Sequence, residues 1–175
     1  MDDGLIRVIV TTALGQVFVG VDAVNAPLSA SAFLEQVDMG ALDYTSVYRI
    51  VTQEQQPPSI RDRIDVIQWG YRFEDPRAVP PVAHEPTSVT GLRHRRGTLS
   101  MARRDVGTAG FGFFFCLSGD LKSLDEGGLR QPDGYGFAAF GEVLEGWPVL
   151  DAIFARAESM DRLANPIEIM TVRRA

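Results

Sequence analysis

The sequence predicts a mainly β protein, folded as a closed eight-stranded antiparallel barrel that is capped by two α-helices. About eight short segments are rich in β-branched and apolar residues, and connections that contain glycine or proline separate them. Only two segments have a helical pattern, which is too few for the regular alternation of helices and strands in a parallel sheet. Closure into a barrel removes the exposed edges of an antiparallel sheet, so the barrel is the favoured arrangement.

The strand-like segments are distributed along the whole chain. The first two flank Leu14 and Gly15, and glycine tolerates the positive φ of a tight hairpin connection. The polar stretch 53–65 and the proline-containing stretch 74–97 are predicted to be mostly irregular, because proline fixes φ and removes an amide donor. The predicted strands are residues 6–11, 16–21, 46–52, 66–69, 97–103, 113–118, 137–144 and 167–173.

Two helices are predicted from the residues at their ends. Ser29 is placed to cap the first helix by accepting hydrogen bonds from free backbone amides. Leu28 and Phe33 have the spacing of a hydrophobic staple, and Gly40 is placed to end this helix. Pro148 suits the first turn of the second helix, because proline lacks an amide hydrogen and its φ is near the helical value.

Length and charge limit the domain organisation and the partners. The chain has 175 residues and is expected to form one monomeric domain that spans residues 1–175. The net charge of −6 should repel phosphate backbones, so nucleic acid is not an expected partner. A run of about 18 apolar residues is absent, so no association with a membrane is expected. The acidic start is unlike a secretory signal, which predicts a cytoplasmic protein, or a periplasmic or secreted one if a signal peptide has been removed.

Few side chains are suited to disulfides or metals. Cys116 is the only cysteine, and its apolar neighbours predict that it is buried. His84 and His94 lack the spacing of a metal site and are predicted to be surface residues. The basic run Arg93–Arg96 is predicted to be a solvated loop. No metal and no cofactor is therefore expected.

Several motifs follow one another in a recognisable order. The most specific is Gly97–Ala102, with the pattern Gly-x-Leu-Ser-Met-Ala. The other motifs are Pro27–Phe33, Ser46–Ile50, Phe113–Phe115 and Phe140–Val143. Together they resemble the cyclophilin family of peptidyl-prolyl cis-trans isomerases. In this family they correspond to the first helix, the strand with the catalytic arginine, and the strands that flank the proline pocket.

The resemblance implies an enzyme that rotates X–Pro bonds in proline-containing peptides or unfolded protein segments. Resonance between the nitrogen lone pair and the carbonyl gives this rotation a barrier of about 20 kcal/mol. A hydrogen-bond donor directed at the prolyl nitrogen would stabilise the twisted bond more than either planar form. The resemblance implies that Arg49 is this donor, and its guanidinium stays charged at any working pH. The chemistry needs no covalent step and no cofactor.

The resemblance also implies which residues hold the substrate. Asp65 falls where a pocket phenylalanine belongs in the family, and Ile60 or Ile64 is an alternative source of apolar surface. The implied substrate-binding residues are Gln68, Phe114, Val66, Ala102, Arg103, Gly112, Phe137 and Leu124.

Several of these positions depart from the family pattern. Arg103 replaces an asparagine, Gly112 replaces a glutamine, and Phe137 replaces a histidine. Ser123 stands where many members have the tryptophan that recognises cyclosporin. We therefore expect weaker activity, an altered sequence preference and poor cyclosporin binding.

Two other functions stay open as alternatives. The substitutions at Asp65, Gly112 and Phe137 favour a catalytically weak peptide-binding module on the same barrel. A barrel that holds a small ligand in an internal cavity is disfavoured, because large side chains such as Phe113 and Phe115 indicate a filled interior.

Overall fold

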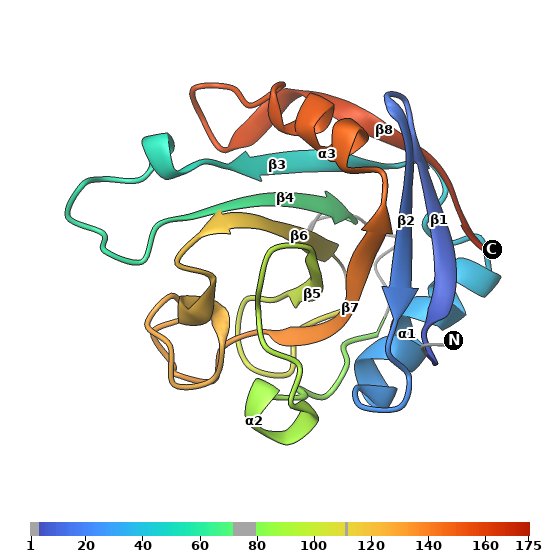
Figure 1. The fold of residues 1–175 in the computed structure, drawn as a ribbon, viewed down its shortest axis with the longest axis horizontal. Coiled ribbons are helices and arrows are strands. Elements are labelled where there is room, and N and C mark those ends of the chain that lie inside the picture. Colours follow the sequence, from blue (N-terminus) through green and yellow to red (C-terminus); the bar gives the residue numbers. More distant parts are fainter. Residues whose placement is uncertain (1–3, 72–79, 111) are drawn as a thin grey trace.

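The computed structural model describes residues 4–71, 80–110 and 112–175, and these form a closed barrel of eight antiparallel strands (Figure 1). Around the barrel the strands follow the order β1-β2-β7-β5-β6-β4-β3-β8, and β8 pairs with β1 to close it. The predicted fold class is therefore confirmed. The strands are β1 (Ile6–Thr12), β2 (Gly15–Val21), β3 (Thr45–Val51), β4 (Ile64–Gly70), β5 (Thr98–Ala102), β6 (Gly112–Gly119), β7 (Ala138–Glu145) and β8 (Arg162–Arg174).

β1 and β2 form the predicted hairpin. Their register pairs Thr12 with Gly15. Gly15 has a φ of 135°, and a Cβ at this position would lie 2.7 Å from a methyl group of Val149 in α3 (Trp147–Phe154). Glycine is therefore needed here both for the backbone conformation and for the close approach of the helix.

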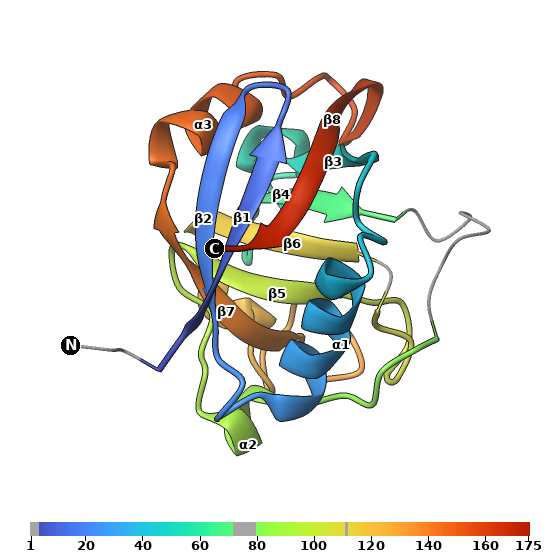
Figure 2. The ribbon, with the colours of Figure 1, turned by 90° about the vertical axis from the view of Figure 1, so that its right-hand side faces the viewer.

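The two predicted helices, α1 (Pro27–Asp38) and α3, lie at opposite ends of the barrel (Figures 1 and 2). A third helix, α2 (Thr87–Thr90), adds one short turn to the stretch 74–97, which was predicted to be mostly irregular. Residues 74–79 of that stretch lie outside the described residues. None of the described helices is long and apolar enough to cross a membrane. Short 3-10 helices occur at Gln53–Gln55 and Leu121–Leu124.

The start of α1 differs from the prediction. The helix is capped at Ala26, and Ser29 lies inside its first turn, where its buried hydroxyl has no hydrogen-bond partner among the described residues. The carboxylate of Glu85 accepts hydrogen bonds from the backbone amides of Leu28, at 3.1 Å, and Ser29, at 2.6 Å. This carboxylate also lies at the positive end of the helix dipole. Leu28 is 51% exposed and no longer holds the staple position, so the predicted cap and staple are both wrong.

The end of α1 follows the prediction. Gly40 has a φ of 67°, and its amide donates a hydrogen bond to the carbonyl oxygen of Val37 at 3.1 Å. A residue in the left-handed conformation stops the helix and satisfies a carbonyl group of its last turn.

Aromatic rings fill the interior of the barrel. Phe33 of α1 meets Phe113 edge-on, with ring centroids 5.0 Å apart, and Phe140 at 5.2 Å. Trp69 stacks on Phe115 at 5.7 Å. All five side chains are at most 3% exposed. This packing agrees with the predicted filled interior and disfavours an internal ligand cavity.

Phe114 lies on the opposite side of β6 from its two neighbours, as strand alternation predicts. Its ring belongs to a second apolar cluster on the outer side of the barrel wall. Cys116 lies in this cluster and is buried, as predicted, and burial, followed by the charge of Asp125, raises the pKa of its thiol. The thiol is therefore protonated and unreactive at neutral pH. The rest of the cluster is Val51, Ile64, Val66, Ala102, Leu121, Leu124 and Phe137.

Replacing Glu85 with alanine should destabilise the fold, because two backbone amides of α1 then lose their acceptor. We expect the free energy of unfolding to fall by about 1–2 kcal/mol in urea denaturation. Glu35→Ala, an exposed position on the same helix, is the matched control and should change it by less than about 0.5 kcal/mol. Equal losses in the two variants would contradict the capping role.

Candidate active site

The outer apolar cluster forms one side of a surface pocket of about 230 Å³. Every residue predicted to act on the substrate lines this pocket except Gly112. The apolar lining is Val51, Ile64, Val66, Ala102, Phe114, Leu124 and Phe137, and the polar lining is Arg49, Gln68, Arg103, Arg130, Gln131 and Arg162. One face of the pocket is thus apolar and the other carries hydrogen-bond donors.

Arg49 extends from β3 into the pocket and is held by two side chains. Its Nε donates a hydrogen bond to Asp161 at 2.7 Å, and its Nη1 donates one to the Oε1 of Gln68 at 3.2 Å. Gln68 lies on the neighbouring strand β4 and in turn donates a hydrogen bond to the hydroxyl of Tyr48 at 2.7 Å. The guanidinium is therefore fixed in direction, while the Arg49 side chain is still 33% exposed to the pocket and solvent.

Asp161 is the carboxylate partner of Arg49, and the sequence analysis missed it. It precedes β8 and lies 112 positions from Arg49, so no local motif marks it. Burial is the largest influence and acts to raise the pKa of its carboxyl, but the hydrogen bond and charge of Arg49, with the contribution of Arg162, hold the pKa below its usual value. Asp161 is therefore ionised at neutral pH and stabilises the charged guanidinium.

The apolar face of the pocket is built around Phe114. Phe137 meets this ring edge-on, with centroids 5.4 Å apart. Val66, Ala102 and Leu124 complete the same cluster, and each is at most 5% exposed. A flat apolar floor of this kind, with a hydrogen-bond donor beside it, can accept an apolar ring that has a polar neighbour.

Asp65 does not enter the pocket. The register of β4 against β6 shifts between Asp65 and Val66, and the Asp65 carboxylate binds the backbone and side chain of Gln53 and the hydroxyl of Ser118. Ile64 lines the pocket instead, which is one of the two expected alternatives. The other, Ile60, is 37% exposed and does not line the pocket. The polar residue at position 65 therefore does not weaken the apolar face.

Gly112 lies at the start of β6 and faces Tyr48. A Cβ at position 112 would lie 2.7 Å from the Tyr48 hydroxyl oxygen, which is too close for an undisturbed contact. The space that a longer side chain would need is therefore taken by the buried tyrosine. Position 112 contributes no side chain to the pocket.

Arg103 lines the pocket, but its donors are used within the protein. Its guanidinium makes two hydrogen bonds to Asp133, at 2.7 and 2.9 Å, and two to the carbonyl oxygen of Gly136, at 2.9 and 2.6 Å. It also lies over the ring of Phe137, 5.4 Å from the centroid. The Arg103 hydrogen bond is the main cause that lowers the pKa of Asp133 to about 2. Arg103 thus anchors the connection before β7 and holds Phe137 in place.

A buried polar network adjoins Phe114. The ring of His94 lies parallel to that of Phe114, with centroids 6.2 Å apart, so the prediction that His94 is a surface residue is wrong. Its ring nitrogens bond to Asp125 at 2.7 Å and to the hydroxyl of Ser100 at 2.8 Å. Serine, histidine and aspartate joined in this order also occur in hydrolases. Here each is at most 4% exposed, so no substrate can reach the hydroxyl.

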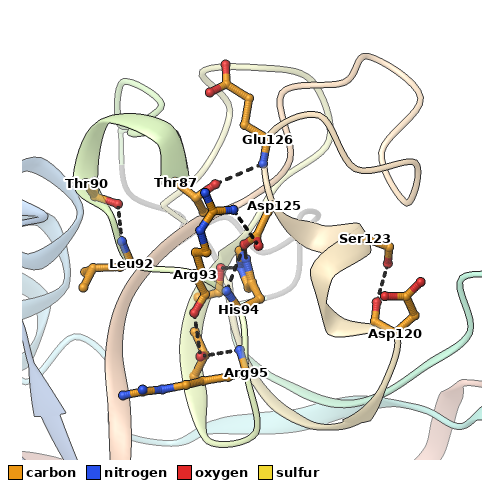
Figure 3. A network of polar contacts seen from close by, with 12 residues as sticks. Thr87, Thr90, Leu92, Arg93, His94, Arg95, Asp120, Ser123, Asp125 and Glu126 are labelled. Atoms are coloured by element: carbon orange, nitrogen blue, oxygen red, sulfur yellow. Dashed lines mark hydrogen bonds and ion pairs between the residues drawn. The ribbon is translucent and has the colours of Figure 1, made fainter.

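The same network ties two connections of the barrel together, as Figure 3 shows. The backbone amide of His94 also donates to Asp125, at 2.9 Å, and the hydroxyl of Thr87 accepts a hydrogen bond from the amide of Glu126 at 3.0 Å. Ser123 is buried and donates to the carbonyl oxygen of Asp120 at 2.6 Å, so it does not line the pocket. Poor cyclosporin binding stays a prediction.

The three arginines of the basic run Arg93–Arg96 are exposed, as predicted for a solvated loop, and only His94 is buried. The side chains of Arg93 and Arg95 are 74% exposed, as predicted for a surface loop. Arg96 is also exposed, and its guanidinium lies over the ring of Trp147 in α3, 4.1 Å from its centroid. His84 is partly exposed and contacts the carbonyl oxygen of Tyr135 at 2.9 Å. No group of three potential metal ligands occurs among the described residues.

Comparisons with known proteins address the identity of this chain. The profile of the family described as "Cyclophilin type peptidyl-prolyl cis-trans isomerase/CLD" matches residues 7–174. The chain is 32% identical over 150 residues to peptidyl-prolyl cis-trans isomerase A of Dickeya dadantii, covering 84% of this chain and 70% of that protein. It is 28% identical over 145 residues to peptidyl-prolyl cis-trans isomerase cyp18 of Streptomyces antibioticus, covering 81% and 79%.

A solved structure supports the fold. The crystal structure of a cyclophilin type peptidyl-prolyl cis-trans isomerase of Cryptosporidium parvum, in the presence of the dipeptide Ala-Pro, superimposes with a TM-score of 0.72 at 17% identity. The superposition covers 97% of this chain and 98% of that one. Barrel, motifs and relatives define an isomerase of peptide bonds that precede proline. The chain belongs to the cyclophilin-type peptidyl-prolyl cis-trans isomerase family.

The buried pair of His94 and Asp125 should make stability depend on pH. Burial is the largest influence on Asp125 and acts to raise its pKa, but hydrogen bonds from His94 and the nearby charges of His94 and Arg93 lower it overall. A lowered folded-state pKa gives stability that is complete above the unfolded value of about 3.9 and is lost as the pH falls through the folded value.

We therefore expect Asp125→Asn to lower the free energy of unfolding by roughly 1–3 kcal/mol at pH 7. The difference from the wild type should shrink as the pH falls below about 4. Chemical denaturation measures this difference in the free energy of unfolding between pH 3 and pH 7, two values chosen to bracket the unfolded pKa. A difference that stays constant over this range would show that the carboxylate charge is not involved.

Proposed function

We propose that this chain isomerises X–Pro bonds in peptides and unfolded protein segments, with Arg49 as the donor to the prolyl nitrogen. The observation that carries the proposal is the position of the Arg49 guanidinium in the same pocket as Phe114, where Asp161 and Gln68 hold it. The proline ring would lie on the apolar face, and the rotating amide would lie beside the guanidinium.

The physical basis is the loss of amide resonance during rotation. In the planar forms the nitrogen lone pair is delocalised and is a poor hydrogen-bond acceptor, whereas in the twisted form it is localised and accepts well. A donor at that position binds the twisted form more tightly than the planar forms, which lowers the barrier of about 18–20 kcal/mol. Because Asp161 and Gln68 orient Arg49 in advance, little reorganisation is needed during the reaction.

The apolar face provides the second requirement, which is a grip on one side of the rotating bond. Phe114, Phe137 and Leu124 offer contact surface to a proline ring and exclude water from it. With the ring held, the carbonyl group before it can turn relative to the nitrogen. The depth of burial of Phe114, which is 5% exposed, indicates that its ring is packed and rigid.

A catalytically weak peptide-binding module is the second candidate. The observation that favours it is Gly112, because Tyr48 fills the space in which a longer side chain could contact the substrate backbone. Fewer polar contacts to the substrate backbone would weaken catalysis, while the apolar face could still bind a proline ring. The monomeric state, the cytoplasmic location, and the lack of nucleic-acid and membrane partners stay predictions that rest on charge and composition.

Arg49→Ala tests the proposal directly. Loss of a donor that acts in the transition state should lower kcat/KM by about 100-fold in a proline-peptide isomerisation assay. Arg7→Ala, an exposed position on β1 outside the pocket, is the matched control and should retain the wild-type rate. Equal background rates for the wild type and Arg49→Ala would favour the binding module.

Asp161→Ala tests the positioning of Arg49. Without its acceptor the guanidinium can turn away from the prolyl nitrogen, so we expect kcat to fall by about tenfold with little change in KM. Asp38→Ala, which removes an exposed ion pair with Arg174, serves as the control. A fall in thermal stability without a change in kcat would assign Asp161 a purely structural role.

A further inference from the structure

The pocket is positively charged although the protein is acidic. Four guanidinium groups line it, and none of its described lining residues carries a carboxylate. The chain as a whole has a net charge of −6. A proline ring needs no positive charge beyond the one donor of the proposed mechanism, so the other arginines call for a separate explanation.

Two of the four charges are balanced within the protein. Arg49 pairs with Asp161, and Arg103 pairs with Asp133, each at 2.7 Å. Arg49 and Arg103 need no anionic ligand, because each guanidinium already has a carboxylate partner.

The other two arginines have more distant carboxylate neighbours. The charge of Asp62 acts on Arg130, and Asp161, which is hydrogen-bonded to Arg49, acts on Arg162. Arg130 donates to neutral oxygens, the Oε1 of Gln56 at 2.6 Å and the carbonyl of Asp62 at 3.4 Å. Arg162 lies over the ring of Tyr48, 5.6 Å from the centroid. Neither forms an ion pair with a carboxylate among the described residues. Burial, and next the charge of Arg49, lower the pKa of Arg130, while the charge of Asp62 acts to raise it.

The positions of these arginines suggest which part of a substrate they would meet. Arg162 on β8 is the cross-strand partner of Arg49 on β3, so it flanks the proposed donor. Arg130 comes from the connection between β6 and β7 and lines the same pocket. With the proline ring on Phe114 and its nitrogen at Arg49, a residue adjacent to the proline would lie within reach of both.

We propose that the pocket selects proline peptides in which a residue next to the proline carries an anion, a carboxylate or a phosphate, bound by Arg130 and Arg162. Guanidinium groups bind both anions through paired hydrogen bonds. This inference rests on the proposed function for the position of the proline, but it concerns binding and can be tested without catalysis.

The test compares matched peptides that differ only beside the proline. One set carries Glu or Gln, and another carries phosphoserine or Ser, before or after the proline. Dissociation constants from NMR titration and isomerisation rates are measured for the wild type, for Arg130→Gln/Arg162→Gln, and for Arg7→Gln as the control. We expect the anionic peptide of a pair to bind about threefold to tenfold more tightly in the wild type and in Arg7→Gln.

The ratio should approach one in the double variant, and it should also fall at about 0.5 M salt because the charges are screened. A gain shared by Glu and phosphoserine identifies a general anion site, and a gain confined to phosphoserine identifies phosphate. Equal affinities within each wild-type pair, or an undiminished ratio in the double variant, would overturn the inference.

The two proposals fail in different ways. If neutral peptides are isomerised at rates that depend on Arg49 but anionic peptides bind no better, the anion preference is wrong and the proposed function stands. If anionic peptides bind better but no peptide is isomerised, the arginines select ligands for a binding module.

Discussion

In a closed barrel each strand sends alternate side chains to the interior and to the outer surface, and β6 is apolar on both sides. Phe113 and Phe115 fill the interior, while Phe114 faces outward and forms the floor of the pocket. The same packed wall therefore serves two apolar clusters. Because the interior is filled by interlocking rings, the outer floor rests on a closely packed support.

Polar contacts hold the parts of the pocket that the apolar wall does not. The connection between β6 and β7 borders the pocket and is fixed at two points. Asp133 of this connection binds Arg103, which follows β5, and Asp125 of the same connection binds His94, which precedes β5. Removing Asp133 or Asp125 leaves its partner, Arg103 or His94, buried without its carboxylate, so these contacts affect the geometry of the site as well as its stability.

The fold and much of the site could be predicted from the sequence, because local patterns encode them. Strand alternation separates Phe114 from its neighbours, and the ordered motifs place Arg49 and Gln68 on adjacent strands. The errors concern contacts between distant parts of the chain. Glu85 caps a helix 56 positions away, and Asp161 reaches Arg49 from 112 positions away. No periodicity records such contacts. The burial of His94 was missed because its partner Asp125 lies in another connection.

The close approach of Gly112 and Tyr48 couples the two positions. Any side chain at position 112 would collide with the tyrosine hydroxyl, and that hydroxyl is also the acceptor for Gln68. The two positions therefore cannot change independently. A longer residue at 112 would need a smaller residue at 48, and that change would remove the hydroxyl that accepts from Gln68.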